Sequence, residues 1–265
     1  MEGAMEEFVY DVLNEDGWWW SRGRRALIKA LASRYASNSN GLRKILDIGC
    51  GTGTTIKEME AYAPTVCGLD ISPTALRYCS QRGISSVSLG DASVLPFQDG
   101  QFDLVISVDL LEHMEDDVGA LREMHRVVKP GGVVIATVPA FQRLWSRRDE
   151  QLRHKRRYTK EQLQRKVTRA GLMVQRATYI NLPLLLPLFL LVQAGRLFSR
   201  NPIRSMDHVL VPRPVNEVLS WVVEGEARWL AHANLPIGVS IACVAARSKE
   251  ASAAGVQNAG GPVGV

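Results

Sequence analysis

Three glycines at alternate positions, Gly49, Gly51 and Gly53, directly follow the apolar run 44–48, which carries Asp47 near its end. Glycine adopts positive φ angles and has no Cβ, so such a turn can bend sharply and let a ligand lie against the backbone. A helix that begins after Gly53 would direct its free N–H groups into the same crevice. This order of strand, turn and helix predicts a nucleotide-type site at the carboxyl end of a first parallel strand.

Acidic residues also end two later apolar runs. Asp70 closes the run 65–70, and Asp91 closes the run 87–91. A carboxylate at the end of a second parallel strand accepts hydrogen bonds from vicinal ribose hydroxyls, whichever nucleotide is bound. Asp91 also fits the simpler role of capping its own loop. The spacing G-x-G-x-G at 49–53 is tighter than the G-x-G-x-x-G of dinucleotide-binding turns, so the turn disfavours a pyrophosphate ligand.

Together with the segments 102–113 and 126–135, these features closely resemble class I S-adenosylmethionine-dependent methyltransferases. The resemblance implies S-adenosyl-L-methionine as cofactor, S-adenosyl-L-homocysteine as product, and a glycine turn that packs against the amino-acid end of the cofactor. Two further segments, 18–25 and 154–159, resemble a bacterial branch with a Trp-rich N-terminal helix and an H-x-R-R-Y-T-like element, so the likeness extends over about residues 7–247. The motifs are G-C-G-T-G with Asp47, then Asp70, Asp91, the segment 102–113 and the segment 126–135.

The resemblance also implies cofactor contacts residue by residue. Asp70 would bind the ribose hydroxyls, and Asp91 the exocyclic amine of adenine between apolar neighbours. A basic residue of the N-terminal helix would pair with the methionine carboxylate, with Arg22 as first choice and Arg25 as second. The alternative is that the tryptophans and arginines of this helix only pack it on the edge of the sheet. The implied cofactor residues are Trp20, Arg22, Asp47, Gly49, Cys50, Gly51, Gly53, Asp70, Ile71, Asp91, Ala92, Ser107 and Val108.

Catalytic groups are harder to assign, because a sulfonium methyl group is already electrophilic. A base is needed only for a poorly acidic hydroxyl or a protonated amine. His113 follows the fourth predicted strand at the edge where acceptors bind, and it is the first candidate for that base. Its alternative role is to cap the next helix or to bind a neighbouring loop. Tyr158 and His154 are the second-rank catalytic candidates, and no metal site is predicted.

The elements that position these residues predict an α/β fold. We expect a Rossmann-like, seven-stranded, mostly parallel sheet with helices on both faces. Strands six and seven are expected at 172–180 and 238–246, with helices at 159–171 and 215–233. The predicted regions are an N-terminal helical entrance at 1–40, a core at 41–180 and 236–248, a helical cap at 181–235 between strands six and seven, and a disordered tail at 249–265.

The apolar run within 183–198 is the most ambiguous segment. Uncharged sequence extends only from 179 to 195, with Pro183 and Pro187 at its start. A membrane-spanning helix needs roughly 20 apolar residues, so a single crossing is not expected. The run could be a buried helix, a dimer contact, a substrate lid or a peripheral membrane contact. We favour a lid with an apolar inner surface, which indicates a hydrophobic or lipid-linked acceptor.

Composition is that of a globular enzyme. The 265 residues are 46% hydrophobic and 22% charged, with a net charge of +5, and the four cysteines lack C-x-x-C spacing. The absence of a signal-like start and of paired cysteines favours a reduced, cytoplasmic protein, with contact at the inner face of the membrane as an option. Basic residues crowd 143–169, either as a solvated surface or as a site for an anionic partner. No nucleic-acid motif accompanies them.

These patterns predict a methyltransferase that uses in-line displacement on a hydrophobic, anionic or lipid-linked acceptor. Two alternatives remain, a membrane-peripheral polyprenyl or lipid methyltransferase and a non-catalytic cofactor-binding homologue. The sequence fixes neither the acceptor atom nor the oligomeric state.

Overall fold

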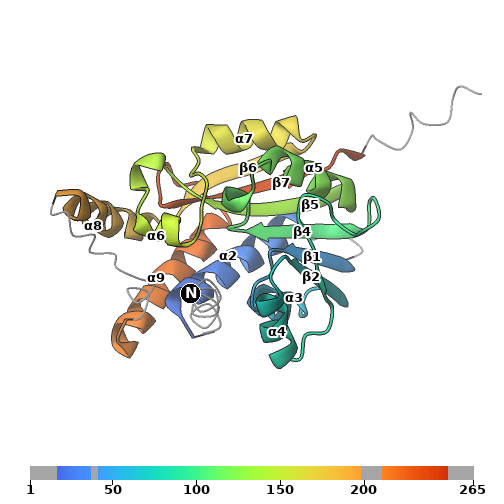
Figure 1. Cartoon of the computed structure of the whole chain (residues 1–265), viewed down its shortest axis with the longest axis horizontal. Helices are drawn as coiled ribbons and strands as arrows, with labels where there is room; N and C mark the ends of the chain where they lie inside the picture. The colour runs from blue at the N-terminus through green and yellow to red at the C-terminus, as the bar shows by residue number, and fades with distance from the viewer. Residues whose placement is uncertain (1–16, 37–40, 198–210, 250–265) are drawn as a thin grey trace, which may run out of the picture.

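The structure, a computed structural model, describes residues 17–36, 41–197 and 211–249 and contains a seven-stranded sheet that is mostly parallel, as predicted (Figure 1). Its strand order is β3-β2-β1-β4-β5-β7-β6, and β7 runs antiparallel to both of its neighbours. The predicted α/β Rossmann-like fold is therefore confirmed. The strands are β1 (Lys44–Ile48), β2 (Thr65–Asp70), β3 (Val87–Leu89), β4 (Phe102–Val108), β5 (Val128–Pro139), β6 (Met173–Ile180) and β7 (Ser240–Ala246).

Helices cover both faces of the sheet. In Figure 1, α5 and α7 lie on one face, while α2, α3 and α4 lie on the other. Short 3₁₀ turns follow β4, β5 and β6: η1 (Leu111–His113), η2 (Gln142–Leu144) and η3 (Leu182–Leu184). The helices are α2 (Trp19–Tyr35), α3 (Thr54–Met59), α4 (Pro73–Gln81), α5 (Asp117–Val127), α6 (Arg147–Gln151), α7 (Lys160–Arg169), α8 (Leu185–Leu197) and α9 (Arg213–Leu230).

Local sequence signals explain several helix starts. The Ser72 hydroxyl accepts a hydrogen bond from the Ala75 N–H at 3.3 Å, and Pro73 occupies the first helical position. At α7, Thr159 and Gln162 form a capping box, with reciprocal bonds of 3.2 and 2.9 Å. Each arrangement satisfies N–H groups that a helix start otherwise leaves unpaired.

One expected boundary differs from the structure. The sequence around the Pro130 motif favours a helix that stops at Pro130, but α5 ends at Val127 and β5 already begins at Val128. The residue before a proline is disfavoured in the helical region, so the chain becomes extended ahead of Pro130. Gly131 then takes a φ of 78° and donates its N–H to Arg247 O at 2.8 Å. The Pro-Gly-Gly turn therefore lies inside the strand and fastens it to the end of the β7 segment.

The core is centred on β1, β4 and β5. Their side chains are apolar on both faces, as expected for strands that helices cover on both sides. Val105, Ile106 and Ile135 are fully buried. Because β1, β2, β4 and β5 are parallel, their carboxyl ends meet at one edge, where the following loops can build a site.

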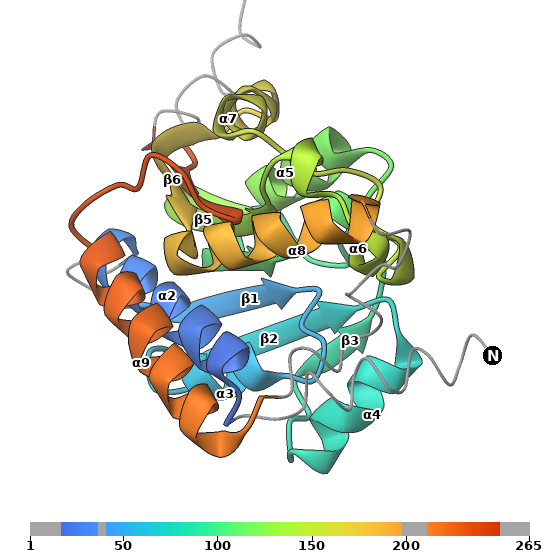
Figure 2. The ribbon, with the colours of Figure 1, turned by 90° about the vertical axis from the view of Figure 1, so that its left-hand side faces the viewer.

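The segment between β6 and β7 forms α8 and α9. Helix α9 lies alongside α2, as Figure 2 shows, although nearly two hundred residues separate them in sequence. The Trp19 N–H donates to Asn216 Oδ1 at 3.0 Å. A Cβ on Gly23 would lie 2.7 Å from Val223 Cγ2, so glycine permits this close approach.

None of the helices in the described ranges combines the length and apolar character that a bilayer crossing requires. The predictions for 1–16, 198–210 and 250–265, which include parts of the entrance, the cap and the tail, lie outside the described residues.

Candidate functional site

The glycine turn has the conformation that its sequence predicts. Gly49, Gly51 and Gly53 have φ angles of 73°, 53° and 78°, in the region that favours glycine. A Cβ on Gly53 would lie 2.4 Å from Ile84 Cδ1, so a larger residue could not enter without displacing the core. The Gly49 N–H bonds to Leu69 O at 2.7 Å, which joins the turn to the end of β2.

Asp47 lies beneath this turn and is 2% exposed. Burial, followed by the nearby charge of Asp70, raises its pKa to about 7, and Arg24 offsets this only in part. A carboxylate in this position is stabilised by a bound cation such as an ammonium group. The side of the turn that carries Asp47 therefore suits a positively charged ligand group.

Asp70, Ile71 and Asp91 lie at the ends of β2 and β3. The Asp70 carboxylate accepts from Gly51 N and Ser72 N, both at 2.9 Å, which orients it beside the glycine turn. Ile71 is 70% exposed, an apolar surface next to that acid. Asp91 accepts from Ser93 N at 2.8 Å, the local loop contact that the simpler reading predicted. Ala92 is buried beside it.

At the end of β4, Ser107 is fully buried, and its hydroxyl has no hydrogen-bond partner within the described part of the chain. Val108 and Asp109 follow and line a narrow recess of about 20 Å³ between the sheet edge, α2 and α9. Asp109 bonds Arg24 and accepts from Thr137 Oγ1 at 2.9 Å. Burial opposes ionisation of Asp109, yet the Arg24 guanidinium holds its pKa below the usual range.

The structure directs Arg24 toward this recess, whereas Arg22 and Arg25 bind elsewhere. Arg22 donates to Glu224 and Glu217 of α9 at 2.8 and 2.9 Å. Arg25 lies 3.5 Å from Glu58. These contacts occupy both arginines expected to bind the cofactor carboxylate. Sequence reasoning missed Arg24, although it is four residues from Trp20 and therefore on the same helix face.

Trp20 is half-buried and lines the recess, while Trp18 and Trp19 are buried. The guanidinium groups of Arg24 and Arg148 each lie 5.8 Å from the centre of the Trp20 ring. Trp19 lines the recess as well, with its ring edge to face against the ring of Trp20.

Tyr158 does not occupy the position expected of a catalytic group. It is 2% exposed, and its hydroxyl bonds to Leu111 O at 3.0 Å and Asp117 Oδ2 at 2.8 Å. Burial, followed by the charge of Asp117, raises its pKa far above the usual value. Through these bonds Tyr158 fastens its loop to η1 and α5, and its catalytic role stays a prediction.

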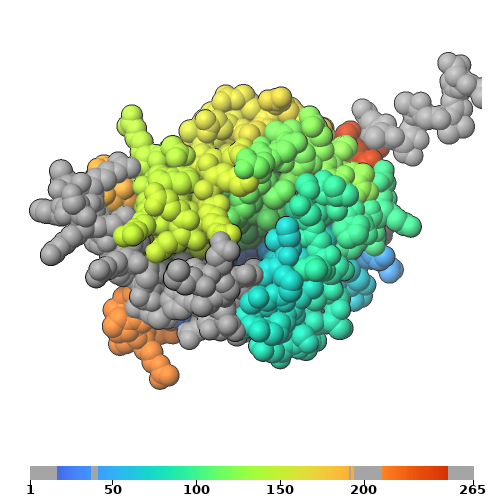
Figure 3. Space-filling model, viewed as in Figure 1, coloured from blue at the N-terminus to red at the C-terminus, as the bar shows by residue number. Residues whose placement is uncertain are grey.

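The basic segment is partly neutralised by acids of the same surface. Lys155 pairs with Glu115, while Arg156 and Lys166 both pair with Asp117. In Figure 3, the yellow-green residues of this segment form a continuous surface next to the green residues that follow β4. Much of the positive charge therefore holds this loop in place.

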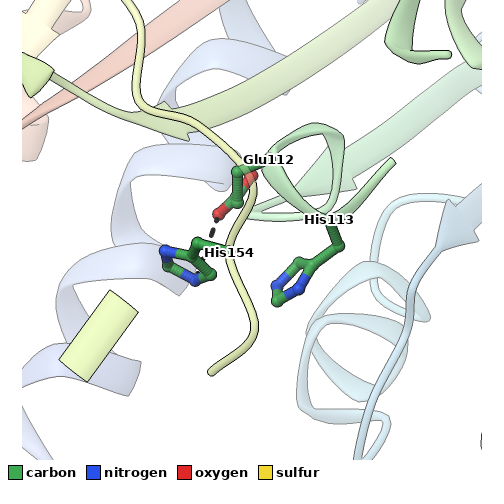
Figure 4. Close-up of side chains that lie close together, drawn as sticks. All are labelled: Glu112, His113 and His154. Carbon is green, nitrogen blue, oxygen red and sulfur yellow. Dashed lines mark ion pairs between the residues drawn. The ribbon is translucent and has the colours of Figure 1, made fainter. Parts of the chain in front are cut away.

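Both histidine candidates lie close to Glu112 (Figure 4). The rings of His113 and His154 meet edge to face, with centroids 4.8 Å apart. Burial, followed by the charge of His154, lowers the pKa of His113 to about 4. Potential ligand atoms of the three residues lie within 4.8 Å of one another, a geometry that could hold a metal ion and that the sequence did not predict.

The sequence of this chain is similar to known methyltransferases. Residues 46–136 match the family described as "Methyltransferase domain". A norajmaline N-methyltransferase from Rauvolfia serpentina is 35% identical over 113 residues, which are 39% of this chain and 38% of that protein. A demethylmenaquinone methyltransferase from Staphylococcus aureus is 38% identical over 116 residues, which are 39% of this chain and 48% of that protein. The chain thus spans less than half the length of these relatives.

Solved structures show the same fold at low identity. The [4+2]-cyclase SpnF has a TM-score of 0.61 at 22% identity, covering 93% of this chain and 94% of its own. Phosphoethanolamine N-methyltransferase 2 from Haemonchus contortus, in complex with S-adenosyl-L-methionine, has a TM-score of 0.52 at 18% identity, covering 84% of this chain and 52% of its own. Residues 46–136 therefore belong to a methyltransferase domain, and the chain has the fold of the class I S-adenosylmethionine-dependent methyltransferases.

Proposed function

We propose that this protein transfers a methyl group from S-adenosyl-L-methionine to a small acceptor. The observation that carries the proposal is Asp47, a buried carboxylate beneath the glycine turn whose charge calls for a cation. The cofactor has an ammonium group at its amino-acid end and a sulfonium next to it. The curated relatives, which are methyltransferases, support the same activity.

The residues at the edge of β1 to β4 fit this cofactor. In our proposal, Asp47 holds its ammonium group, and the turn 49–53 lies against its amino-acid chain. Asp70, already oriented by two backbone N–H groups, accepts from the ribose hydroxyls. The exposed side chain of Ile71 supports the adenine ring, and Asp91 accepts from its amine.

The recess lined by Trp20, Arg24 and Asp109 suits the acceptor. It adjoins β4, β5 and β7, beside the glycine turn but without contributions from it. Its largely apolar lining favours a hydrophobic acceptor, while Arg24 in that lining is paired with Asp109. Transfer requires the acceptor atom to lie in line with the S–CH₃ bond, so the recess acts by orienting the acceptor and excluding water.

Calorimetry with S-adenosyl-L-methionine tests the cofactor site. We expect binding to one site, with affinity reduced at least tenfold in Asp70→Ala and abolished in Gly51→Arg. The exposed helix position Gly225 offers a control, because a Cβ there meets nothing within 4 Å and Gly225→Ala should bind normally. Undiminished binding in both site variants would refute the assignment.

Incubating a cell extract with labelled cofactor and the purified protein would identify the acceptor by mass spectrometry. A methylated product that Asp70→Ala fails to form supports the proposal. Tight cofactor binding without transfer to any compound would instead favour a non-catalytic homologue. This outcome is a real alternative, because the fold is shared with a protein described as a cyclase.

A membrane-peripheral lipid methyltransferase is the second candidate. The observation that favours it is an exposed apolar surface on α8, where Leu186, Phe189 and Leu190 are 65%, 41% and 57% exposed. Such a surface can insert between lipid headgroups. Vesicle sedimentation measures this lipid binding. We expect it to be lost in the double variant Leu186→Glu/Leu190→Glu and after deletion of 183–198. Binding that survives both changes would exclude α8 as the contact.

A further inference from the structure

Glu112 is a fully buried acid that faces His154 Nε2 at 4.0 Å. The side chain is fully buried in η1, and neither carboxylate oxygen has a hydrogen-bond partner within the described residues. Burial raises its pKa well above the usual value. Burying a carboxylate without a partner is costly, so a retained one calls for a proton or a cation.

Two imidazole rings face this carboxylate. His154 Nε2 lies 4.0 Å from Glu112 Oε1, and the His113 ring packs edge-on against the His154 ring (Figure 4). The ligand atoms of all three residues lie within 4.8 Å of one another. Ligand atoms around a tetrahedral ion with bonds of roughly 2.0–2.2 Å lie about 3.4 Å apart, so these atoms must approach one another by up to about 1.4 Å when an ion binds.

Each ring is also held by a second acceptor, as in metal sites where the outer contact fixes the ligating nitrogen. His154 Nδ1 lies 2.9 Å from Asp149 Oδ1, which leaves Nε2 directed at Glu112. Arg157 bonds both oxygens of Asp149, at 2.7 and 3.0 Å. Burial opposes ionisation of Asp149, but the hydrogen bonds from His154 and then Arg157 hold its pKa below the usual range. The backbone of Arg153 makes the corresponding bond to the His113 ring.

The two loops that carry these residues are fastened together. Lys155 N donates to Glu112 O at 2.8 Å, one residue beyond His154. Tyr158 then bonds Leu111 O, one residue before Glu112. The cluster is therefore preorganised by contacts outside it, as an ion site requires.

A protonated Glu112 explains less of this geometry than a bound cation does. A protonated carboxyl group gains a donor, but neither oxygen has an acceptor within hydrogen-bond distance in the described part of the chain. It would also leave His154 Nε2 directed at a group 4.0 Å away. A cation satisfies the carboxylate and both free ring nitrogens at once.

We propose that Glu112, His113 and His154 bind one divalent transition-metal ion and leave a coordination position open. Two imidazoles and one carboxylate form a ligand set that suits Zn²⁺, and three protein ligands leave a position for another molecule. Asp109 and Arg24, which line the recess, interact electrostatically with Glu112.

A role for the ion rests on the proposed methyl transfer. The ion would bind an acceptor hydroxyl oxygen and lower its pKa, so that its proton would pass to solvent before the bound acceptor is shielded from water. The oxygen lone pair then forms the O–CH₃ bond while the S–CH₃ electron pair returns to sulfur, giving neutral S-adenosyl-L-homocysteine. His113 and His154 would act as ligands in place of the base expected from sequence.

Metal titration of the full chain after chelator treatment tests the site. We expect calorimetry with Zn²⁺ to show one ion per chain, and Co²⁺ to give the visible absorption of a low-symmetry site. Glu112→Gln and His154→Asn should each weaken Zn²⁺ binding at least 100-fold. Asp149→Asn should weaken it 10- to 100-fold, as outer-partner variants do. His232→Asn is the matched control, because His232 lies after α9, outside the cluster, and should bind as the parent does.

The nearly isosteric Glu112→Gln variant keeps the test independent of misfolding. It removes a buried charge, so its Tm without metal should equal or exceed that of the parent, while the Zn²⁺-dependent rise in Tm should disappear. No Zn²⁺ binding by the parent, or equal binding by the parent and Glu112→Gln, would overturn the inference. Intact S-adenosyl-L-methionine binding and transfer without metal would overturn it and leave the proposed function standing. Metal binding without any cofactor binding would support the ion site and refute the proposed function.

Discussion

The two halves of the carboxyl edge are built in different ways. The half around β1 and β2 is held by backbone geometry, namely the positive φ angles of 49–53 and the N–H groups that orient Asp70. The half beyond β4 is held by side chains from distant elements, such as Arg24 on Asp109 and Arg157 on Asp149. The first can be recognised from a short motif, whereas the second depends on how α2, η1 and the loop 153–158 meet. We therefore expect substitutions in the first half to change cofactor affinity, and substitutions in the second half to change stability and metal binding.

The largest effect is expected in the backbone-built half. Gly53→Val places a branched side chain at a φ of 78° and a Cβ 2.4 Å from Ile84, so the turn must distort. We expect cofactor affinity to fall more than 100-fold and the free energy of unfolding to fall by about 3 kcal/mol. Calorimetry and denaturant unfolding measure the two effects. Retained affinity would show that the turn does not form the cofactor site.

In the side-chain-built half, Arg157→Gln should act on stability and metal binding. It leaves Asp149 buried with one charged partner fewer, which costs about 3 kcal/mol in comparable buried pairs. Where the variant is folded, its affinity for S-adenosyl-L-methionine should stay within threefold of the parent. A selective loss of cofactor affinity would show that the two halves are not separate.

Asp47 gives the cofactor half its own pH dependence. Because its pKa is raised from 3.8 to about 7, the native state retains a proton that the unfolded state releases. The ligand-free protein should therefore lose stability as pH rises from about 4 to about 7. Affinity for the cationic cofactor should rise over about pH 6 to 8, since binding needs the ionised carboxylate. Calorimetry across this range checks the trend, and Asp47→Asn should bind weakly with the trend abolished.

The smallest expected effect concerns Arg22, which the sequence placed at the cofactor. Its ion pairs with Glu217 and Glu224 are partly exposed, so Arg22→Gln should cost at most about 1 kcal/mol of stability. Cofactor affinity should change less than twofold. Arg24→Gln is the matched variant and should lower kcat/KM for the acceptor about tenfold. A tenfold loss of cofactor affinity in Arg22→Gln would restore the original assignment.

The same contrast explains which features could be predicted from the sequence. The seven strands, the capped starts at Ser72 and Thr159 and the glycine turn follow from short-range patterns, and the structure has them. The choice between Arg22 and Arg24 depends on the rotation of α2 about its axis, which α9 sets from nearly two hundred residues away. Tyr158 has the residue type of a catalytic group, and only its two buried hydrogen bonds reveal another role. Glu112 gave no signal, because an acid after a strand is ordinarily exposed.

The contact of Gly23 with Val223 has a consequence during synthesis of the chain. Helix α2 leaves the ribosome nearly two hundred residues ahead of α9. At roughly 5–20 residues per second, about 10 to 40 seconds separate them. Throughout that interval, the face of α2 that will meet α9 has no partner, and the recess has no second wall. A nascent chain can therefore complete its glycine turn well before it can enclose an acceptor.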